Sequence, residues 1–126
     1  VVVSKHHEVG SARNPRLDPY RHRAAEFRDN KGRRGRFYVE PHQGSTAISG
    51  HLWWTRWSPP EEFVILWLET PEGYDTDTSI LPEDLPDELD AWDQGQFRFL
   101  EETYQLTWLD DAATEAMRAA LEIDEA

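Results

Sequence analysis

Histidine and carboxylate side chains are the groups in this sequence best suited to acid–base chemistry or metal binding. His6 and His7 are adjacent, so in an extended segment their side chains point in opposite directions. No two histidines have the i, i+4 spacing of a helical zinc motif. An acid–base site, if the chain had one, would combine His51 with Glu40 and His42. We expect instead exposed or packing histidines, and no catalytic, cofactor-binding or metal-binding residue.

The run at residues 75–79, DTDTS, resembles the first half of a calcium-binding loop. Such a loop needs glycine at its sixth position and glutamate at its twelfth, where this chain has Ile80 and Pro86. The run is therefore more typical of a turn rich in Asp and Thr. Glycine-rich phosphate loops and the G-x-S-x-G motif are absent. The chain also has no cysteine, which excludes disulfides, thiolate metal sites and cysteine nucleophiles.

Three short segments combine residue types that are common at binding surfaces. The first is a basic group around Gly35, the second mixes tryptophan with arginine, and the third is part of an expected acidic helix. Tryptophan and arginine are enriched among the residues that dominate protein–protein binding energies. The candidate interaction residues are Arg33, Arg34, Arg36, Trp53, Arg56, Trp57, Asp87, Glu88 and Asp90.

Charge is distributed unevenly along the 126 residues, whose net charge is −12. Residues 1–40 hold ten basic and five acidic residues, a balance of +5, whereas residues 41–126 hold three basic and twenty acidic residues, a balance of −17. Such a contrast within one chain is a compositional sign of interaction. Three interpretations are open. In the first, the basic part pairs with the acidic part, within the molecule or between copies. In the second, the basic part binds nucleic acid or an acidic partner. In the third, the acidic part faces a basic partner or imitates DNA.

The elements that must position these residues are predicted from hydrophobic periodicity. We expect an α+β fold: a single small domain with a bent antiparallel sheet of about five strands, a C-terminal helix and an N-terminal basic arm containing a short helix. The arm is residues 1–36, with its helix near 18–29, and the acidic domain is residues 37–126. The expected strands are 37–40, 46–57, 63–68, 96–100 and 103–109, and further helices are expected near 86–92 and after Asp110.

The segments between these elements are predicted as well. Residues 41–44 are expected to turn, residues 74–93 to form a connector, and residues 101–102 to lie in a loop wider than two residues. The apolar run 63–68 is expected to be a central strand with most side chains buried. The core is expected to enclose Trp67, Trp92 and Trp108.

These features predict a non-catalytic protein-interaction or assembly module: an accessory subunit, an oligomer that exchanges its N-terminal arm, or a virion component. The alternative is a small acidic inhibitor or immunity-type protein that blocks a basic nuclease or DNA-binding enzyme. The expected partner is a protein or a second copy of the chain, and nucleic acid could bind only through the basic arm. No apolar run approaches the roughly 20 residues that span a bilayer, so we expect no membrane partner and a location in the cytoplasm or a virion.

Overall fold

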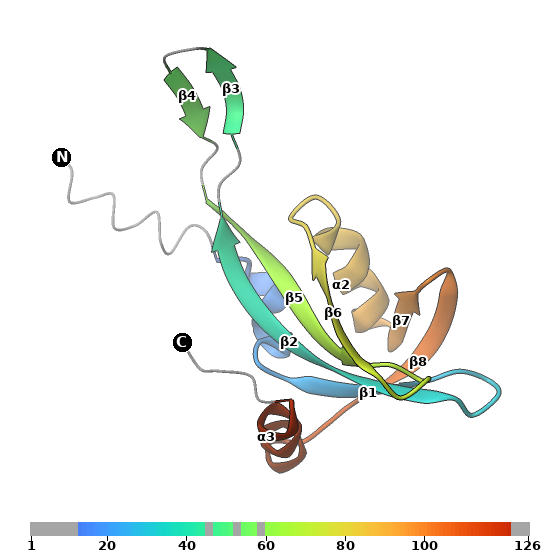
Figure 1. Cartoon of the computed structure of the whole chain (residues 1–126). Helices are drawn as coiled ribbons and strands as arrows, with labels where there is room; N and C mark the ends of the chain where they lie inside the picture. The colour runs from blue at the N-terminus through green and yellow to red at the C-terminus, as the bar shows by residue number, and fades with distance from the viewer. Residues whose placement is uncertain (1–12, 45–46, 52–53, 58–59, 122–126) are drawn as a thin grey trace.

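A curled antiparallel sheet of six strands, in the order β6-β5-β2-β1-β8-β7, organises the chain, and β3 and β4 form a separate hairpin (Figure 1). The structure is a computed structural model that describes residues 13–44, 47–51, 54–57 and 60–121. It confirms the α+β class, with six strands in the main sheet where about five were expected. The strands are β1 (Ala24–Arg28), β2 (Arg34–Gly44), β3 (Ala47–His51), β4 (Trp54–Trp57), β5 (Glu61–Glu69), β6 (Asp75–Ile80), β7 (Gln96–Phe99) and β8 (Glu102–Trp108). The helices are the 3-10 helix η2 (Pro15–Tyr20) and the α-helices α2 (Leu85–Asp93) and α3 (Asp111–Ala120).

The inner face of the sheet carries the main hydrophobic core. Alternate side chains along β1, β2 and β5 point to this face, because successive residues of a strand face opposite sides. Aromatic rings fill its centre: the centroids of Phe27 and Phe97 are 4.9 Å apart, and those of Phe37 and Trp92 are 5.7 Å apart. Leu17 from η2 and three residues of α2 close the cluster. Both helices are therefore fixed to the sheet by buried apolar contacts.

The outer face is covered in part by α3. The Asp110 side chain accepts a hydrogen bond of 2.8 Å from the Ala113 amide, which caps the helix. Met117 is buried against Ala24 and Tyr38, which point away from the inner core. The smaller outer cluster thus holds α3 against β1 and β2.

The predicted helix near residues 18–29 is wrong in extent. Only the six residues of η2 are helical, and residues 24–28 form β1, which pairs with β2 and β8. Ala25 and Phe27 point to the core, so a strand accounts for the same apolar residues. A helix of about twelve residues is marginal by itself, whereas two neighbouring strands satisfy the backbone of β1. The expected boundary at residue 36 falls within β2.

Two further predictions fail beside β2. The expected turn at residues 41–44 is the end of β2. This strand tolerates Pro41 because the antiparallel β1 begins at Ala24, opposite Tyr38, and does not extend beside Pro41. The Val39 amide donates to the Arg23 carbonyl, so the nitrogen of Pro41 points to the same side, where β1 offers no further partner strand, and it needs no hydrogen. The long strand expected over 46–57 is two strands, with His51 opposite Trp54.

The region expected to be a connector begins with the edge strand β6. Thr78 and Ile80 lie opposite Leu66 and Val64 of β5 and face the inner side. The carboxylates of the same run alternate with them, and this period of two, with β-branched threonines, is typical of a strand. The turn expected for residues 75–79 is therefore wrong.

The connection between β7 and β8 is a tight turn of two residues, where a wider loop was predicted. Phe99 pairs with Glu102, and the two residues between them, Leu100 and Glu101, have φ angles of 50° and 67°. Positive φ at both positions is the geometry that favours Asn-Gly in hairpins. The sequence lacks that signal here.

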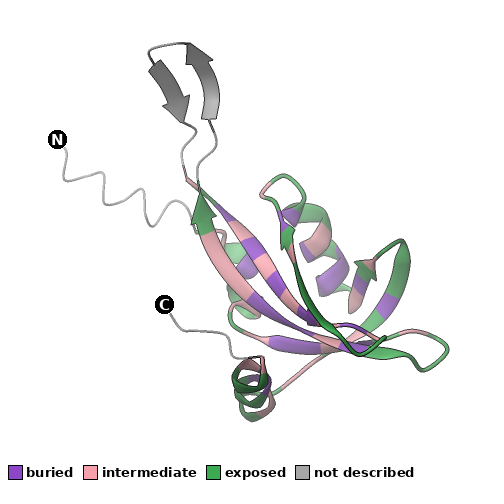
Figure 2. Ribbon diagram, in the orientation of Figure 1, coloured by how far each residue is buried: buried purple, intermediate pink, exposed green. Residues whose placement is uncertain are grey.

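Burial of the tryptophans and of the apolar run in β5 agrees only partly with the predictions. Trp92 is 1% exposed, while Trp67 and Trp108 are half-buried. β5 is an internal strand, as expected, but only its inner side chains are fully buried. Those on its outer face from Phe63 to Glu69 are half-buried and Glu61 is exposed, because α3 covers the sheet only in part (Figure 2).

Candidate functional site

Most basic side chains of the N-terminal segment are paired with carboxylates of the same molecule. Nine basic residues lie between positions 13 and 36. Six of them form ion pairs within the described structure: Arg13, Arg16, Arg21, Arg33, Arg34 and Arg36. These contacts leave few free cations for a phosphate backbone, which nucleic-acid binding by this segment would need.

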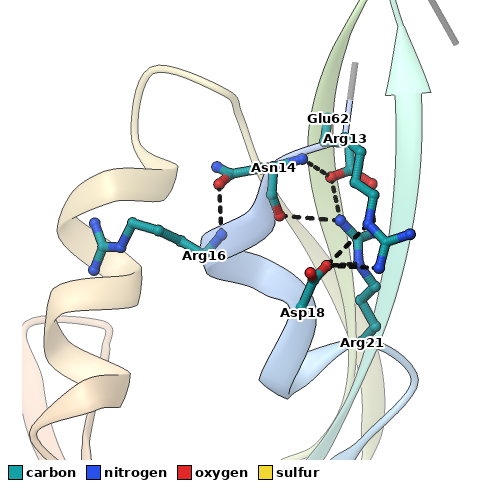
Figure 3. A network of polar contacts seen from close by, with 6 residues as sticks. All are labelled: Arg13, Asn14, Arg16, Asp18, Arg21 and Glu62. Atoms are coloured by element: carbon teal, nitrogen blue, oxygen red, sulfur yellow. Dashed lines mark hydrogen bonds and ion pairs between the residues drawn. The ribbon is translucent and has the colours of Figure 1, made fainter. Parts of the chain in front are cut away.

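The most buried of these contacts fixes η2 to β5 (Figure 3). The guanidinium of Arg21 donates to both carboxylate oxygens of Glu62, at 2.5 and 2.6 Å, and to Asp18 at 2.8 Å. The backbone amide of Asn14 also donates to Glu62. Burial tends to raise the pKa of the Glu62 carboxyl, but the hydrogen bonds from Arg21 and Asn14 outweigh it, so the pKa is lowered.

A second contact joins η2 to α2. Arg16 donates to Asp90 at 2.8 Å and to Asp93 at 3.0 Å. The hydroxyl of Tyr20 also donates to Asp93, and burial together with this hydrogen bond raises the pKa of Tyr20 to about 12. Asp90, one of the predicted interaction residues, is therefore engaged within the molecule.

The three predicted basic residues around Gly35 are also neighbours of carboxylates. Arg33 contacts Glu102 at 2.9 Å, and Arg36 forms two hydrogen bonds of 3.0 Å with Glu69, its cross-strand partner. The guanidinium of Arg34 lies 3.8 Å from Glu26. All three side chains remain partly exposed, but neighbouring carboxylates of the same molecule largely balance their charges.

The carboxylates around β6, in contrast, mostly have no basic partner within the described structure. Between residues 71 and 94 the chain has nine acidic residues and no basic one. Eight of the nine are exposed, and six of these eight take part in none of the ion pairs of the described structure. We call these six residues, which run from the turn before β6 to the first turn of α2, the acidic strip: Glu72, Asp75, Asp77, Glu83, Asp84 and Asp87.

β6 is also an edge of the main sheet. Within the described chain it pairs only with β5, so its other side presents backbone amides and carbonyls without a strand partner. Most of its residues are exposed (Figure 2). Charged side chains on an edge strand discourage uncontrolled pairing with other chains. On β6 these charged side chains are Asp75 and Asp77.

A pocket of about 310 Å³ lies between the two edges of the sheet. Thr78, Ser79 and Ile80 of β6 line one side, and Phe97 and Arg98 of β7 line the other. The remaining lining residues are Leu66, Asp84, Glu88, Phe99 and Leu100. We call this cavity the edge pocket. Its volume is at the lower end of the range for small-molecule sites, which suits a side chain or a small fragment.

Glu88 is the best defined polar group of the edge pocket. One carboxylate oxygen, Oε2, accepts a hydrogen bond of 2.9 Å from the indole Nε1 of Trp92, whose ring is buried. Burial raises the pKa of the Glu88 carboxyl, against the opposing effects of this hydrogen bond and of the positive charge of Arg98. The indole thus holds a half-buried carboxylate in place at the pocket wall.

The other predicted residues are not brought together with this pocket. Arg56 and Trp57 are in β4, for which the structure describes the backbone, and Trp53 lies outside the described residues. His42 forms a contact of 2.6 Å with Glu40 on β2 and stacks on Phe63, while His51 is on β3. Among the described residues, no three histidine or carboxylate side chains are grouped so as to hold a metal ion.

Of the predicted acidic residues, Asp87 belongs to the acidic strip and Glu88 to the edge pocket. Sequence reasoning missed Thr78, Ser79 and Arg98, because it treated β6 as a turn and could not bring β7 next to it. The period of two in residues 75–80 was a signal for the strand. The approach of the two sheet edges had no local signal.

Comparisons with protein-family models, curated proteins and solved structures found no match to this chain. No helix in the described part of the chain is long and apolar enough to cross a membrane. Function must therefore be argued from the acidic strip and the edge pocket themselves.

Proposed function

We propose that this protein is a non-catalytic protein-interaction module in which the acidic strip binds a basic, extended segment of a partner protein along β6. The observation that carries the proposal is a concentration of six exposed carboxylates without ion pairs in the described structure: two on the open edge strand β6, and four in the turn before it and the segment that leads from it into α2. An extended segment that adds to a sheet edge gains main-chain hydrogen bonds, and its side chains supply specificity. Lysine or arginine side chains would neutralise the strip.

The charge distribution favours this partner over the other two that the sequence leaves open. Nucleic acid is disfavoured because the basic segment is largely paired internally while the strip repels phosphate. Pairing of β6 with the same strand of a second copy is disfavoured because Asp75 and Asp77 would face like charges. A subunit of an assembly and a basic enzyme held by an inhibitor would both present the cationic segment that the proposal requires.

A binding titration with matched variants tests the proposal. The probe is a synthetic peptide that alternates lysine and valine, and the affinity is measured by calorimetry at low and at physiological salt. Asp75, Asp77 and Asp87 are changed together to Asn, and the control changes Glu61, Glu101 and Asp111 to Gln, Gln and Asn. Both variants lose three exposed acidic residues, so only the position of the lost charge differs.

The strip variant should bind about tenfold more weakly than the control, because three exposed pairs at about 0.5 kcal/mol each amount to roughly one factor of ten. Binding to the wild type should weaken as salt rises. Equal loss of affinity in the two variants would show that only net charge matters, and the proposed site would be wrong. Absence of binding to the wild type would contradict the proposed function itself.

A further inference from the structure

We propose that the edge pocket binds an alkylammonium group, with Glu88 as the counter-ion and the apolar pocket wall around the alkyl chain. The source of the group is a lysine side chain of the basic segment or a free small amine. The first source rests on the proposed function, whereas the second does not. Nothing in the acidic strip requires a cavity, so the pocket adds a distinct element of recognition.

The composition of the pocket fits this chemistry. Leu66, Ile80 and Phe97 provide apolar surface, as a four-carbon lysine stem requires. Asp84 and Glu88 provide two carboxylates against the single cation of Arg98, so the local balance favours a positively charged ligand. Carboxylate–ammonium hydrogen bonds are about twice as strong as neutral ones.

The fixed carboxylate of Glu88 adds geometric definition. Its Oε2 is occupied by the Trp92 indole at 2.9 Å, and no hydrogen bond of the described structure involves Oε1. Because Trp92 is buried in the core, the orientation of the carboxylate is set before any ligand arrives. Such preorganisation lowers the cost of binding.

The location of the pocket connects it to the edge of β6. Thr78 and Ile80 line the pocket and point to the inner side of the sheet. In a strand paired with β6, alternate side chains would also point to the inner side. One lysine of such a strand could therefore enter the pocket, while its neighbours remain beside the acidic strip.

The test uses n-butylammonium as the ligand and n-butanol, which has the same alkyl chain, as its neutral analogue. The readout is the Trp92 indole signal in a proton–nitrogen correlation spectrum, since this N–H donates to Glu88. Glu88→Gln removes the charge but retains an acceptor for the indole. Glu61→Gln is the matched control, because Glu61 is exposed and belongs to neither the edge pocket nor the acidic strip. The unchanged remainder of each spectrum verifies folding.

We expect n-butylammonium to shift the Trp92 signal saturably and n-butanol to bind about tenfold more weakly. Glu88→Gln should abolish this preference, and Glu61→Gln should preserve it. Arg98→Gln should tighten amine binding, because it removes the opposing cation. Equal binding of amine and alcohol, an unchanged preference in Glu88→Gln, or weaker amine binding in Arg98→Gln would each overturn the inference.

The lysine–valine peptide separates the two sources. A Trp92 shift on peptide binding that is lost in Glu88→Gln supports a lysine side chain as the ligand. Peptide binding without a Trp92 shift would overturn the pocket as its anchor and leave the proposed function intact. A shift with the amine but no peptide binding would support a free amine and contradict the proposed function.

Discussion

At the scale of single residues, the fold depends on a glycine whose position leaves no room for a side chain. A Cβ atom at Gly35 would lie 2.4 Å from the ring of Phe27 and 2.6 Å from the backbone carbonyl oxygen of Glu69. The ring is in the core and the carbonyl is in a paired strand, so neither can move freely. The sequence places Gly35 only at the centre of a basic group, because only the paired sheet reveals this crowding.

Gly35→Ala should therefore lower the free energy of unfolding by about 3 kcal/mol or more, as severe overpacking does. Gly44→Ala is the control from the same strand, since its Cβ would meet only the half-buried ring of Phe63, at 3.3 Å. Chemical denaturation measures both. A Gly35→Ala protein as stable as the Gly44→Ala protein would show that β1 and β2 do not pack as described.

A second prediction at this scale concerns Glu88. Burial raises its pKa, so the ionised form is disfavoured in the folded state. The contribution of Glu88 to the free energy of unfolding is therefore fully present below the ordinary pKa of about 4.5. It is lost as pH rises through the higher pKa that Glu88 has in the folded state.

Glu88→Gln should consequently be more stable than the wild type at pH 7, and the difference should shrink toward pH 4. Asp87→Asn, an exposed change on the same helix, should stay within about 0.5 kcal/mol of the wild type at both values. Denaturation curves at the two pH values provide the measurement. If the stability advantage of Glu88→Gln over the wild type were smaller at pH 7 than at pH 4, the inferred direction of the pKa shift would be wrong. A carboxylate that lowers stability is what a binding group, rather than a structural one, would show.

At the scale of elements, the tight turn between β7 and β8 has an unfavourable sequence. Leu100 and Glu101 both have positive φ, which costs most residues about 1–2 kcal/mol each, and Leu100 is 74% exposed. The double substitution Leu100→Asn with Glu101→Gly introduces the residue types that this turn favours, so it should stabilise the protein by about 1 kcal/mol. A rise in the thermal midpoint would report this effect, and a fall would show that the turn has another geometry.

The N-terminal segment gives a second prediction at this scale. Residues 13–16 contribute mainly exposed ion pairs, which are worth little individually, whereas Leu17 and Phe27 are fully buried. A chain that begins at residue 17 should fold with reduced stability, and one that begins at residue 29 should not fold, because it lacks an internal strand. Circular dichroism and thermal melts distinguish the two. A folded chain lacking β1 would restore the view of residues 1–36 as a separable arm.

The elements show which kinds of information the sequence contains. Helix α2 and the start of α3 are encoded locally, by the spacing of apolar residues and by the acidic residues at 110 and 111, and both helices were predicted at these places. The pairing of β1 was not, because Tyr20, Ala24 and Phe27 have helical spacing and only β2 and β8 make the strand favourable. The edge pocket depends on two strands far apart in sequence, so neither its existence nor the proximity of Arg98 to Glu88 could be derived from periodicity.

At the scale of the whole molecule, the separation of charge between the two parts of the sequence has a structural explanation. The positively charged N-terminal segment forms ion pairs with carboxylates that lie beyond residue 40 in the sequence, through Arg16, Arg21 and Arg33. The remaining negative charge is concentrated at β6 and the start of α2. Net charge of one sign along an open sheet edge is the feature from which we infer a basic, extended partner.

Hydrogen exchange along β6 tests this central claim most directly. In a paired edge strand, alternate amides donate to the neighbouring strand, and the others face outward. When the lysine–valine peptide binds, the outward amides of residues 75–80 should become protected, and the amides of the other edge strand, β7, should not. Protection confined to β7 or to residues 33–36, or peptide binding with no change in β6, would contradict the account.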